Sequence, residues 1–174
     1  TARNTAQQAV DKIDRYFLRT SKSRQSTFGR PLPGGKNWSS EQQLRLEQDL
    51  TERLERTTRF RLTRGELEAH ARLAVARFGV RAAALTAEDN PGIDSLITKS
   101  PQATQQELKY VITNEHAATV DDVMRRRLGL ALTPGAGLEL LPAVVQALRT
   151  YANRSQSELD QEMSIYKKRY QNRS

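Results

Sequence analysis

The most informative part of the sequence is the stretch 104–128, which reads TQQELKYVITNEHAATVDDVMRRRL. Its first half predicts a helix from about Thr104 to Glu115, because apolar residues recur at the spacing of one helix face: Leu108, Val111 and Ile112. Thr119 can cap a second helix, since its hydroxyl can accept a hydrogen bond from a backbone N–H group. Asp121 and Asp122 favour the positive end of that helix's dipole. The stretch therefore predicts two helices joined by a short turn.

Helical signals continue on the N-terminal side of this stretch. Apolar residues recur at steps of three and four from the start of the chain, and this pattern fades near Thr20. A second helix begins after Ser39 or Ser40 and shows a leucine stripe: Leu46, Leu50 and Leu54. Thr63 and Glu66 form a capping box, in which each side chain accepts a backbone N–H of the other residue, and this box opens a third helix.

The C-terminal side is also helical in pattern. The turn residues 134–137 precede a helix that runs through residues 138–148. The last helix starts near Ser155 or Ser157, and its large residues stand four, three and four positions apart: Leu159, Met163, Tyr166 and Tyr170. No stretch alternates apolar and polar residues for long enough to predict a strand. We therefore expect an all-α fold, a compact bundle of six or seven helices without a sheet.

Composition excludes several classes of protein. The chain has 174 residues and no cysteine, which excludes disulfides, zinc–thiolate sites and iron–sulfur clusters. Its two histidines are too few for a multi-histidine metal site. No apolar run approaches the roughly 20 residues of a membrane helix, and the first residues are not a signal peptide, so we expect a cytoplasmic protein. Because Thr1 stands inside a predicted helix without a preceding methionine, we expect a fragment of a longer protein.

The positive charge is concentrated at one end of the chain. The formal net charge is +8, and residues 1–36 alone hold eight basic and two acidic side chains, a net charge of +6. Much of this segment is a loop by composition, since residues 21–37 are rich in Ser, Arg, Gly and Pro. Such a loop is typical of a solvated linker.

Few residues suggest chemistry of their own. His70 lies one position from the buried face of its helix and is interpreted as a boundary histidine without a catalytic role. His116 ends a predicted helix and is interpreted as a cation near the negative end of the dipole. The adjacent carboxylates of Asp121 and Asp122 do not make the pair across a cleft that glycoside hydrolysis requires. The sequence predicts no catalytic residue and no metal ligand.

A run of three arginines, residues 125–127, invites comparison with nucleic-acid binding proteins. Consecutive residues of a helix point about 100° apart, so these side chains cannot all face one groove. We therefore expect no nucleic-acid partner, although an autonomous helical module that binds an anionic partner stays open as the alternative function.

The motifs of this stretch resemble the C-terminal helical domain of FAD-dependent (aerobic) glycerol-3-phosphate dehydrogenases. That family shows E-[LI]-x-Y-x-[VL]-x-x-E, then a gap and D-[DV]-x-[LM]-x-R-R. The corresponding motif residues of this chain are Glu107, Tyr110, Glu115, Asp121, Asp122, Arg126 and Arg127. Segments 31–35 (PLPGG) and 62–79 also resemble family elements in the same order, and the resemblance covers most of residues 1–152.

The resemblance implies a parent flavoenzyme that oxidises glycerol 3-phosphate to dihydroxyacetone phosphate by hydride transfer to FAD and passes electrons to quinone. The family's dinucleotide fingerprint and its phosphate-binding residues lie upstream of this domain. The resemblance therefore implies no catalytic residue and no bound cofactor in this fragment. Thr1 alone resembles a cofactor contact, as the remnant of the family's flavin-contacting turn.

The resemblance also implies a domain organisation and partners. Residues 1–36 would be an N-terminal helix and basic loop that join to an absent FAD domain, and residues 37–174 the C-terminal helical domain. The partners would be the FAD and substrate domains of the same chain and further copies in a homo-oligomer. The role would be structural, in subunit contact or in membrane docking. Peripheral contact with the cytoplasmic face of a membrane would involve three basic side chains: Lys22, Arg24 and Arg30.

One contact follows from the residues themselves. Glu115 and Arg126 belong to successive predicted helices joined by a short turn, and a guanidinium can bind a carboxylate through two hydrogen bonds. We expect these two side chains to pair and to fix the corner, with Tyr110 packed beneath them.

Overall fold

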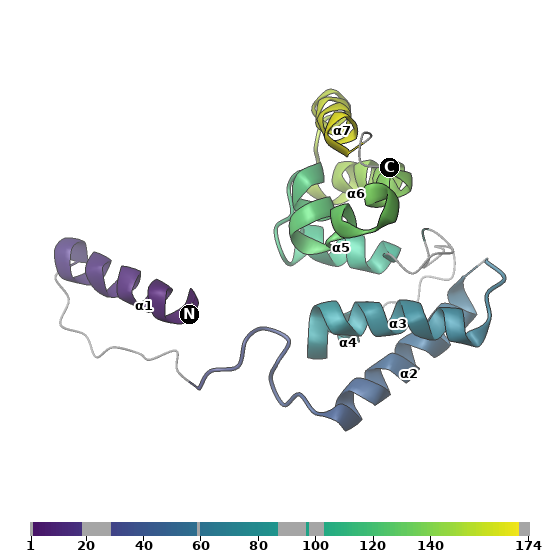
Figure 1. Cartoon of the computed structure of the whole chain (residues 1–174), viewed down its shortest axis with the longest axis horizontal. Coiled ribbons are helices and arrows are strands. Elements are labelled where there is room, and N and C mark those ends of the chain that lie inside the picture. Colours follow the sequence, from purple (N-terminus) through teal and green to yellow (C-terminus); the bar gives the residue numbers. More distant parts are fainter. Residues whose placement is uncertain (1, 19–28, 59, 87–96, 98–102, 171–174) are drawn as a thin grey trace. The chain divides into compact units, whose positions relative to one another are not determined.

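The computed structural model describes residues 2–18, 29–58, 60–86, 97 and 103–170. It divides into two compact units, Thr1–Pro33 and Gly34–Ser174 (Figure 1). Within the described residues the regular elements are helices, seven of them α-helices, and no strand occurs. The prediction of an all-α fold is confirmed. The predicted domain boundary after residue 36 concerns a longer protein and stays a prediction.

The N-terminal unit contains one amphipathic helix. α1 (Ala2–Ile13) continues as one π-helical turn, η1 (Asp14–Leu18), and no residue of α1 is buried. The large apolar side chains near the end of this helix are at least half exposed: Val10, Ile13, Tyr16 and Phe17. The Arg3 guanidinium donates to the Arg30 carbonyl oxygen at 2.8 Å, which ties the helix to the end of the following loop.

The first layer of the C-terminal unit is a pair of helices, α2 (Ser40–Thr57) and α3 (Arg64–Phe78), which pack against each other (Figure 1). The Ser39 hydroxyl accepts the N–H of the third residue of α2 at 3.1 Å. At the start of α3, Thr63 N–H donates to Glu66 Oε2 at 2.7 Å and Glu66 N–H donates back to Thr63 Oγ1 at 3.4 Å. Both predicted N-caps are therefore confirmed.

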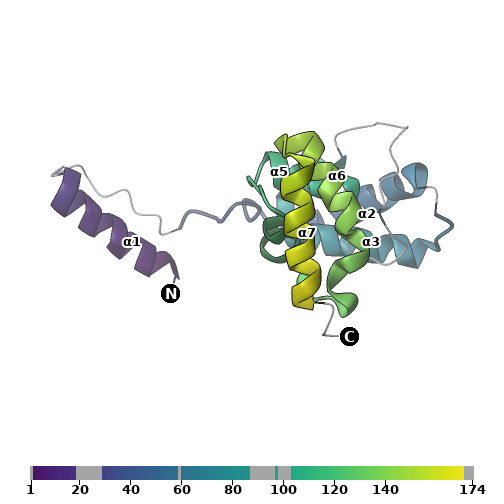
Figure 2. The ribbon, with the colours of Figure 1, turned by 90° about the horizontal axis from the view of Figure 1, so that it is seen from above.

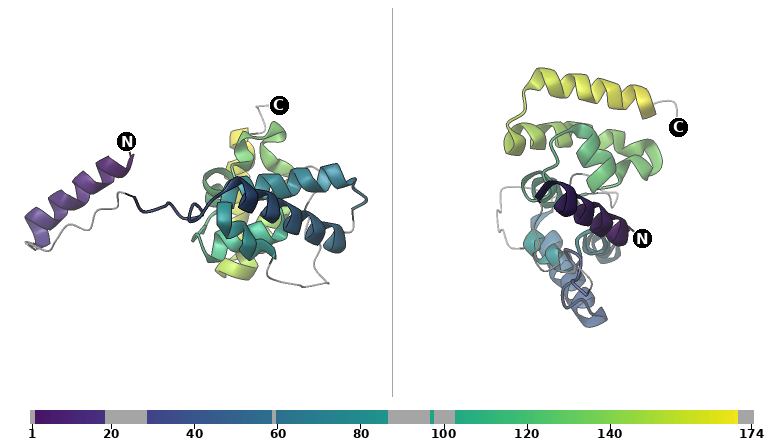
Figure 3. Two further views of the ribbon diagram at one scale, coloured as in Figure 1. Left: turned by 90° about the horizontal axis from the view of Figure 1, so that it is seen from below. Right: turned by 90° about the vertical axis from the view of Figure 1, so that its left-hand side faces the viewer.

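The second layer contains α5 (Gln105–Thr113), α6 (Leu141–Ala152) and α7 (Gln156–Tyr170). Between the two layers, α3 leads through a 3-10 turn, η2 (Gly79–Ala82), into the short α4 (Ala83–Thr86). α6 packs against both α5 and α7, and α7 lies on the side of α6 away from α2 and α3 (Figures 2 and 3). Every helix of this unit contributes to one apolar core, whose largest fully buried side chains include Leu54, Leu108 and Leu148.

Three short helices connect α5 to α6. They are η3 (Asp122–Arg127), η4 (Leu130–Leu132) and η5 (Pro134–Leu140). η3 is a π-helix, and the Leu128 N–H donates to the Val123 carbonyl oxygen, five residues back, at 3.0 Å. The predicted second helix of the stretch 104–128 thus exists, but its turns are wider than those of the expected α-helix.

The predicted turn at residues 134–137 is confirmed and is held by the last helix. Gly135, Ala136 and Gly137 all have positive φ angles, of 70°, 50° and 63°. The Tyr166 hydroxyl of α7 donates to the Ala136 carbonyl oxygen at 2.8 Å inside the core. Burial, with Tyr170 and Asp121 nearby, raises the pKa of Tyr166 to about 12, so the hydroxyl keeps its proton at neutral pH. A left-handed turn is thereby pinned to α7.

We expect Tyr166→Phe to lower the free energy of unfolding by about 1–2 kcal/mol, because it leaves a buried carbonyl without its donor. Urea denaturation of the chain measures this change. Tyr151→Phe is the control, since Tyr151 is 38% exposed and the substitution should change stability by less than about 0.5 kcal/mol. Equal stability of the two variants would show that the hydroxyl does not hold the turn.

Candidate functional site

The seven predicted motif residues lie in two places. Glu107 and Tyr110 belong to α5 and face the end of α3. The other five lie around the corner between α5 and η3: Glu115, Asp121, Asp122, Arg126 and Arg127. The structure thus divides the motif residues between two clusters of the C-terminal unit.

Glu107 is a buried carboxylate with two kinds of partner. The Arg77 guanidinium, near the end of α3, donates to Glu107 Oε1 at 2.8 Å, and the two side chains are 14% and 2% exposed. The Thr104 N–H donates to Glu107 Oε2 at 2.7 Å, and Glu107 N–H donates to Thr104 Oγ1 at 3.1 Å. Glu107 therefore caps α5 and at the same time joins it to α3.

Burial raises the pKa of Glu107 above its ordinary value, and the nearby Arg77 and the hydrogen bonds from Thr104 oppose this rise. The desolvation of a carboxylate in the core outweighs the favourable contacts. Such a group is expensive to keep charged, yet both its oxygens are bonded within the domain. Its geometry suits a structural role better than proton transfer to a substrate.

Tyr110 packs against the same turn of α3. Its ring meets that of Phe78 edge to face, with centroids 5.2 Å apart and planes at 73°. Edge-to-face pairs contribute roughly 0.5–1.5 kcal/mol of stability beyond that from the apolar area that they bury. Tyr110 was expected beneath the corner that follows α5, but its ring contact is with Phe78, on α3.

Gly79, which follows Phe78 at the end of α3, touches the backbone of Gly34 in the segment that precedes α2. A Cβ atom built on Gly34 would stand 2.5 Å from the Phe78 carbonyl oxygen, and one built on Gly79 would overlap the Gly34 carbonyl oxygen. The Val80 N–H donates to that same oxygen at 2.9 Å. Both glycines have positive φ angles, of 87° and 56°. Only residues without a side chain allow this backbone contact.

Three consecutive residues of α3 and its cap therefore each bind a different partner: Arg77 with Glu107, Phe78 with Tyr110, and Gly79 with Gly34. We call this set of six residues the α3 junction. The segments that contain both glycines were identified from the sequence, but the contact between them was not. Arg77 was missed altogether, because nothing in its immediate sequence distinguishes it from other helix arginines.

The expected pair of Glu115 with Arg126 is wrong. Arg126 Nη1 lies 2.6 Å from Asp122 Oδ1 and its Nη2 lies 3.7 Å from Asp121 Oδ2. Arg127 takes the expected place: its guanidinium donates to the Glu115 carbonyl oxygen at 3.1 Å and lies 3.6 Å from Glu115 Oε2. The π-helical turn explains the difference, because its wider spacing changes which arginine faces the corner.

Asp122 closes the start of η3. Its Oδ2 accepts the N–H groups of Ala118 and Thr119 at 3.2 and 3.1 Å, and its own N–H donates to Thr119 Oγ1 at 3.1 Å. Partial burial raises the pKa of Asp122, but the hydrogen bonds of Thr119, Ala118 and Arg126 outweigh it, so the net pKa lies below its ordinary value. Thr119 thus caps the helix as predicted.

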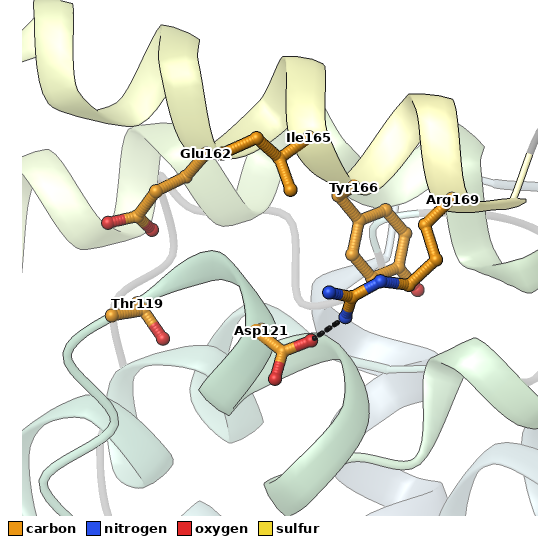
Figure 4. Close-up of a pocket in the computed structure, with 6 residues that line it drawn as sticks. All are labelled: Thr119, Asp121, Glu162, Ile165, Tyr166 and Arg169. Carbon is orange, nitrogen blue, oxygen red and sulfur yellow. Dashed lines mark hydrogen bonds and ion pairs between the residues drawn. The ribbon is translucent and has the colours of Figure 1, made fainter.

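A pocket of about 290 Å³ lies between this corner and α7 (Figure 4). Arg169 reaches across from α7, and its Nη1 lies 3.1 Å from Asp121 Oδ1. Glu162 Oε2 accepts the Val120 N–H at 2.8 Å, while its Oε1 accepts from Arg154 at 2.8 Å. Asp121 and Glu162, the two carboxylates that line the pocket, therefore both bind partners within the domain. We interpret the pocket as a gap between packed helices and not as a ligand site.

The structure also places the two histidines that were considered in the sequence. His70 is 3% exposed and lies on the buried face of α3, so the prediction of a boundary position is wrong. His116 is exposed, with φ of 53°. The described residues contain no group of three metal-ligating side chains and no helix long and apolar enough to cross a bilayer. Predicted residues that fall outside the described part of the chain are Thr1, Lys22 and Arg24.

The chain was compared with protein families, curated proteins and solved structures. No curated protein and no solved structure matches the chain. Residues 25–159 match the family model of the C-terminal domain of alpha-glycerophosphate oxidase. This range includes the PLPGG segment, the α3 junction and both motif clusters. Domains of this family occur in FAD-dependent oxidoreductases. The chain belongs to the family of the C-terminal domain of alpha-glycerophosphate oxidase.

Proposed function

We propose that this chain is the non-catalytic helical domain of an enzyme that oxidises glycerol 3-phosphate to dihydroxyacetone phosphate with FAD and transfers the electrons to a quinone. The support is the family match over residues 25–159 together with the order of the motifs along the chain. In this proposal, the flavin and the substrate belong to an N-terminal domain of the same polypeptide.

The described residues do not fit an FAD molecule. The pocket beside α7 and the one between α4 and α5 each hold about 290 Å³, and both are open grooves. Pockets for drug-sized ligands span about 300–1,000 Å³, and a dinucleotide also needs a glycine-rich phosphate-binding turn. We therefore assign no step of hydride transfer to these residues.

A structural role is favoured by the contacts of the motif residues. Six of the seven bind carboxylate, guanidinium or backbone partners within the domain, and Tyr110 packs on Phe78. The three arginines of the run also pair locally, Arg125 with Asp121 at 2.9 Å. This pairing supports the structural role over the alternative of a module for an anionic partner.

The proposal predicts the behaviour of the protein expressed from its complete reading frame. It should purify with bound FAD, and anaerobic glycerol 3-phosphate should bleach the flavin absorbance and yield dihydroxyacetone phosphate. Glycerol, which lacks the phosphate, is the control and should leave the flavin oxidised. A short-chain quinone analogue should reoxidise the flavin faster than dissolved oxygen.

Four results would contradict the proposal. Absence of flavin would show that the protein is not a flavoenzyme. Reduction of the flavin by another substrate, but not by glycerol 3-phosphate, would show that the proposed substrate is wrong. Faster reoxidation by oxygen would replace the quinone with oxygen as acceptor. Turnover by the isolated 174-residue chain would remove the non-catalytic role.

A further inference from the structure

The boundary between the two units coincides with the glycine contact of the α3 junction. Pro33 is the last residue of the N-terminal unit and Gly34 the first of the C-terminal unit. The Gly34 carbonyl oxygen accepts the Val80 N–H at 2.9 Å, and its backbone lies against Gly79. Gly34 is therefore the point at which the segment leading from the N-terminal unit becomes fixed to the C-terminal unit.

The place of this anchor depends on the end of α3. Gly79 caps α3 two residues after Arg77, and its N–H donates to the Val75 carbonyl oxygen of the last turn, so a shift of that turn displaces both residues. The buried ion pair with Glu107 holds Arg77, and Glu107 in turn is held by the Thr104 N–H at the start of α5. A chain of contacts thus runs from α5 through Glu107, Arg77 and Gly79 to Gly34.

We propose that this chain of contacts is a latch: the Arg77–Glu107 ion pair holds the last turn of α3 in the position that receives Gly34, and breaking the pair frees the segment that joins the two units. The ion pair lies in the last turn of α3, and the glycine contact lies at the C-cap of the same helix, two residues later. The latch couples the motif glutamate to the linker, although the two lie 73 positions apart in sequence.

The latch rests on the contacts of this chain alone, and only its consequence rests on the proposed function. In the proposed flavoenzyme, the latch fixes Gly34, the first residue of the helical domain, to the end of that domain's α3. A closed latch holds Gly34 against the end of α3, whereas an open latch releases the Gly34 carbonyl oxygen from the Val80 N–H.

Amide hydrogen exchange of the 174-residue chain, resolved by residue with NMR, tests the latch. The reporter is the Val80 N–H, which donates to Gly34, and the reference is the Ala136 N–H, which donates to the Thr133 carbonyl oxygen at 2.8 Å in η5. In Glu107→Gln, exchange at Val80 should accelerate at least about tenfold more than at Ala136, because a local opening exposes only the latch. Equal acceleration, or none at Val80, would overturn the proposal.

A matched control is available at the start of α7. Glu158 is also a capping glutamate, which accepts the Ser155 N–H and lies 3.4 Å from Arg154, but it is 58% exposed and distant in the chain. Glu158→Gln should leave the Val80 to Ala136 ratio unchanged, and a change there would also overturn the proposal. If Glu107→Gln does not fold, Glu107→Asp withdraws the carboxylate by one methylene and should raise the ratio about threefold. None of these readouts involves flavin, so failure of the latch is distinct from failure of the proposed function.

Discussion

Gly79→Ala should destabilise the chain by at least about 3 kcal/mol, which corresponds to a melting temperature lower by about 6–12 °C for a protein of this size. Two costs combine. Gly79 has φ of 56° and ψ of −135°, a conformation that costs a residue with a side chain about 1–3 kcal/mol. The added methyl group also overlaps the Gly34 carbonyl oxygen, which is backbone and cannot rotate away. Thermal unfolding followed by circular dichroism measures the change.

Two other glycines separate the steric cost from the conformational one. Gly129 has φ of 65° but open space around its Cβ position, so Gly129→Ala should cost only about 1–2 kcal/mol. Gly65 lies in α3 with open space around it, and Gly65→Ala should stabilise the chain by about 0.5–1 kcal/mol. If Gly79→Ala behaved like Gly129→Ala, the backbone contact with Gly34 would not exist in solution.

Arg77→Met should be the other strongly destabilising change, with a loss of about 3–5 kcal/mol at neutral pH. It removes the cation beside Glu107 and leaves a buried carboxylate without its charge partner. Glu107→Gln keeps an acceptor for the Thr104 N–H and should cost less. The double variant should be less destabilised, by at least about 2 kcal/mol, than the sum of the two single destabilisations predicts, because it leaves no unpaired charge. Urea denaturation of the four proteins measures this coupling.

An exposed ion pair provides the contrast for this cycle. Arg64 lies 3.3 Å from Glu68 on α3, and both side chains are about half exposed, at 56% and 46%. The corresponding cycle, Arg64→Met with Glu68→Gln, should give a coupling below about 0.5 kcal/mol, since water screens the charges. Equal coupling in the two cycles would show that burial adds nothing to the Arg77–Glu107 pair.

The pH dependence of the Arg77→Met variant has a definite sign. The pKa of Glu107 is raised in the folded chain above its ordinary value of 4.5. At a pH between these two pKa values, Glu107 is protonated in the folded state but not in the unfolded state. Stability from this group therefore increases as pH falls through that window. Without Arg77 the pKa rises further, and the deficit of the variant should shrink between about pH 7 and pH 5.

Asp122 and Glu158 do not mask this trend. The pKa values of Asp122 and Glu158 are lowered by their hydrogen bonds, below ordinary values of 3.8 and 4.5, so their contributions are lost only at lower pH. The Arg77→Met/Glu107→Gln variant has no Glu107 carboxyl and should not show the effect. A deficit of Arg77→Met that grows toward pH 5 would contradict the assignment.

Local features of the fold could be predicted from the sequence. The caps at Ser39, Thr63 and Thr119, and the turn at 134–137, depend on residues three or four positions apart, which sequence patterns record directly. The burial of Leu159 and Tyr166 on α7 follows from helical periodicity in the same way. The all-α architecture is the sum of such local signals.

The contacts that fix the arrangement of the helices were not predictable in this way. Arg77 and Glu107 stand 30 positions apart, and Asp121 and Arg169 stand 48 positions apart, so the packing of the helices has to be known first. The choice of Arg127 over Arg126 depends on a single π-helical turn, which periodicity does not reveal. The inward position of His70 likewise required the packing of α3 against its neighbours.

In the proposed function, the motif residues of this domain maintain its structure, and an N-terminal domain of the same polypeptide performs the chemistry. Anaerobic single-turnover reduction of the flavin by saturating glycerol 3-phosphate, in the full-length protein with Arg127→Met, tests this claim most directly. We predict that Arg127→Met lowers the melting temperature of the 174-residue chain by about 2–4 °C, for the loss of about 1 kcal/mol at the Glu115 corner, and leaves the rate constant of the full-length protein within about twofold. A rate constant lower by about tenfold or more, with an unchanged melting temperature, would contradict it.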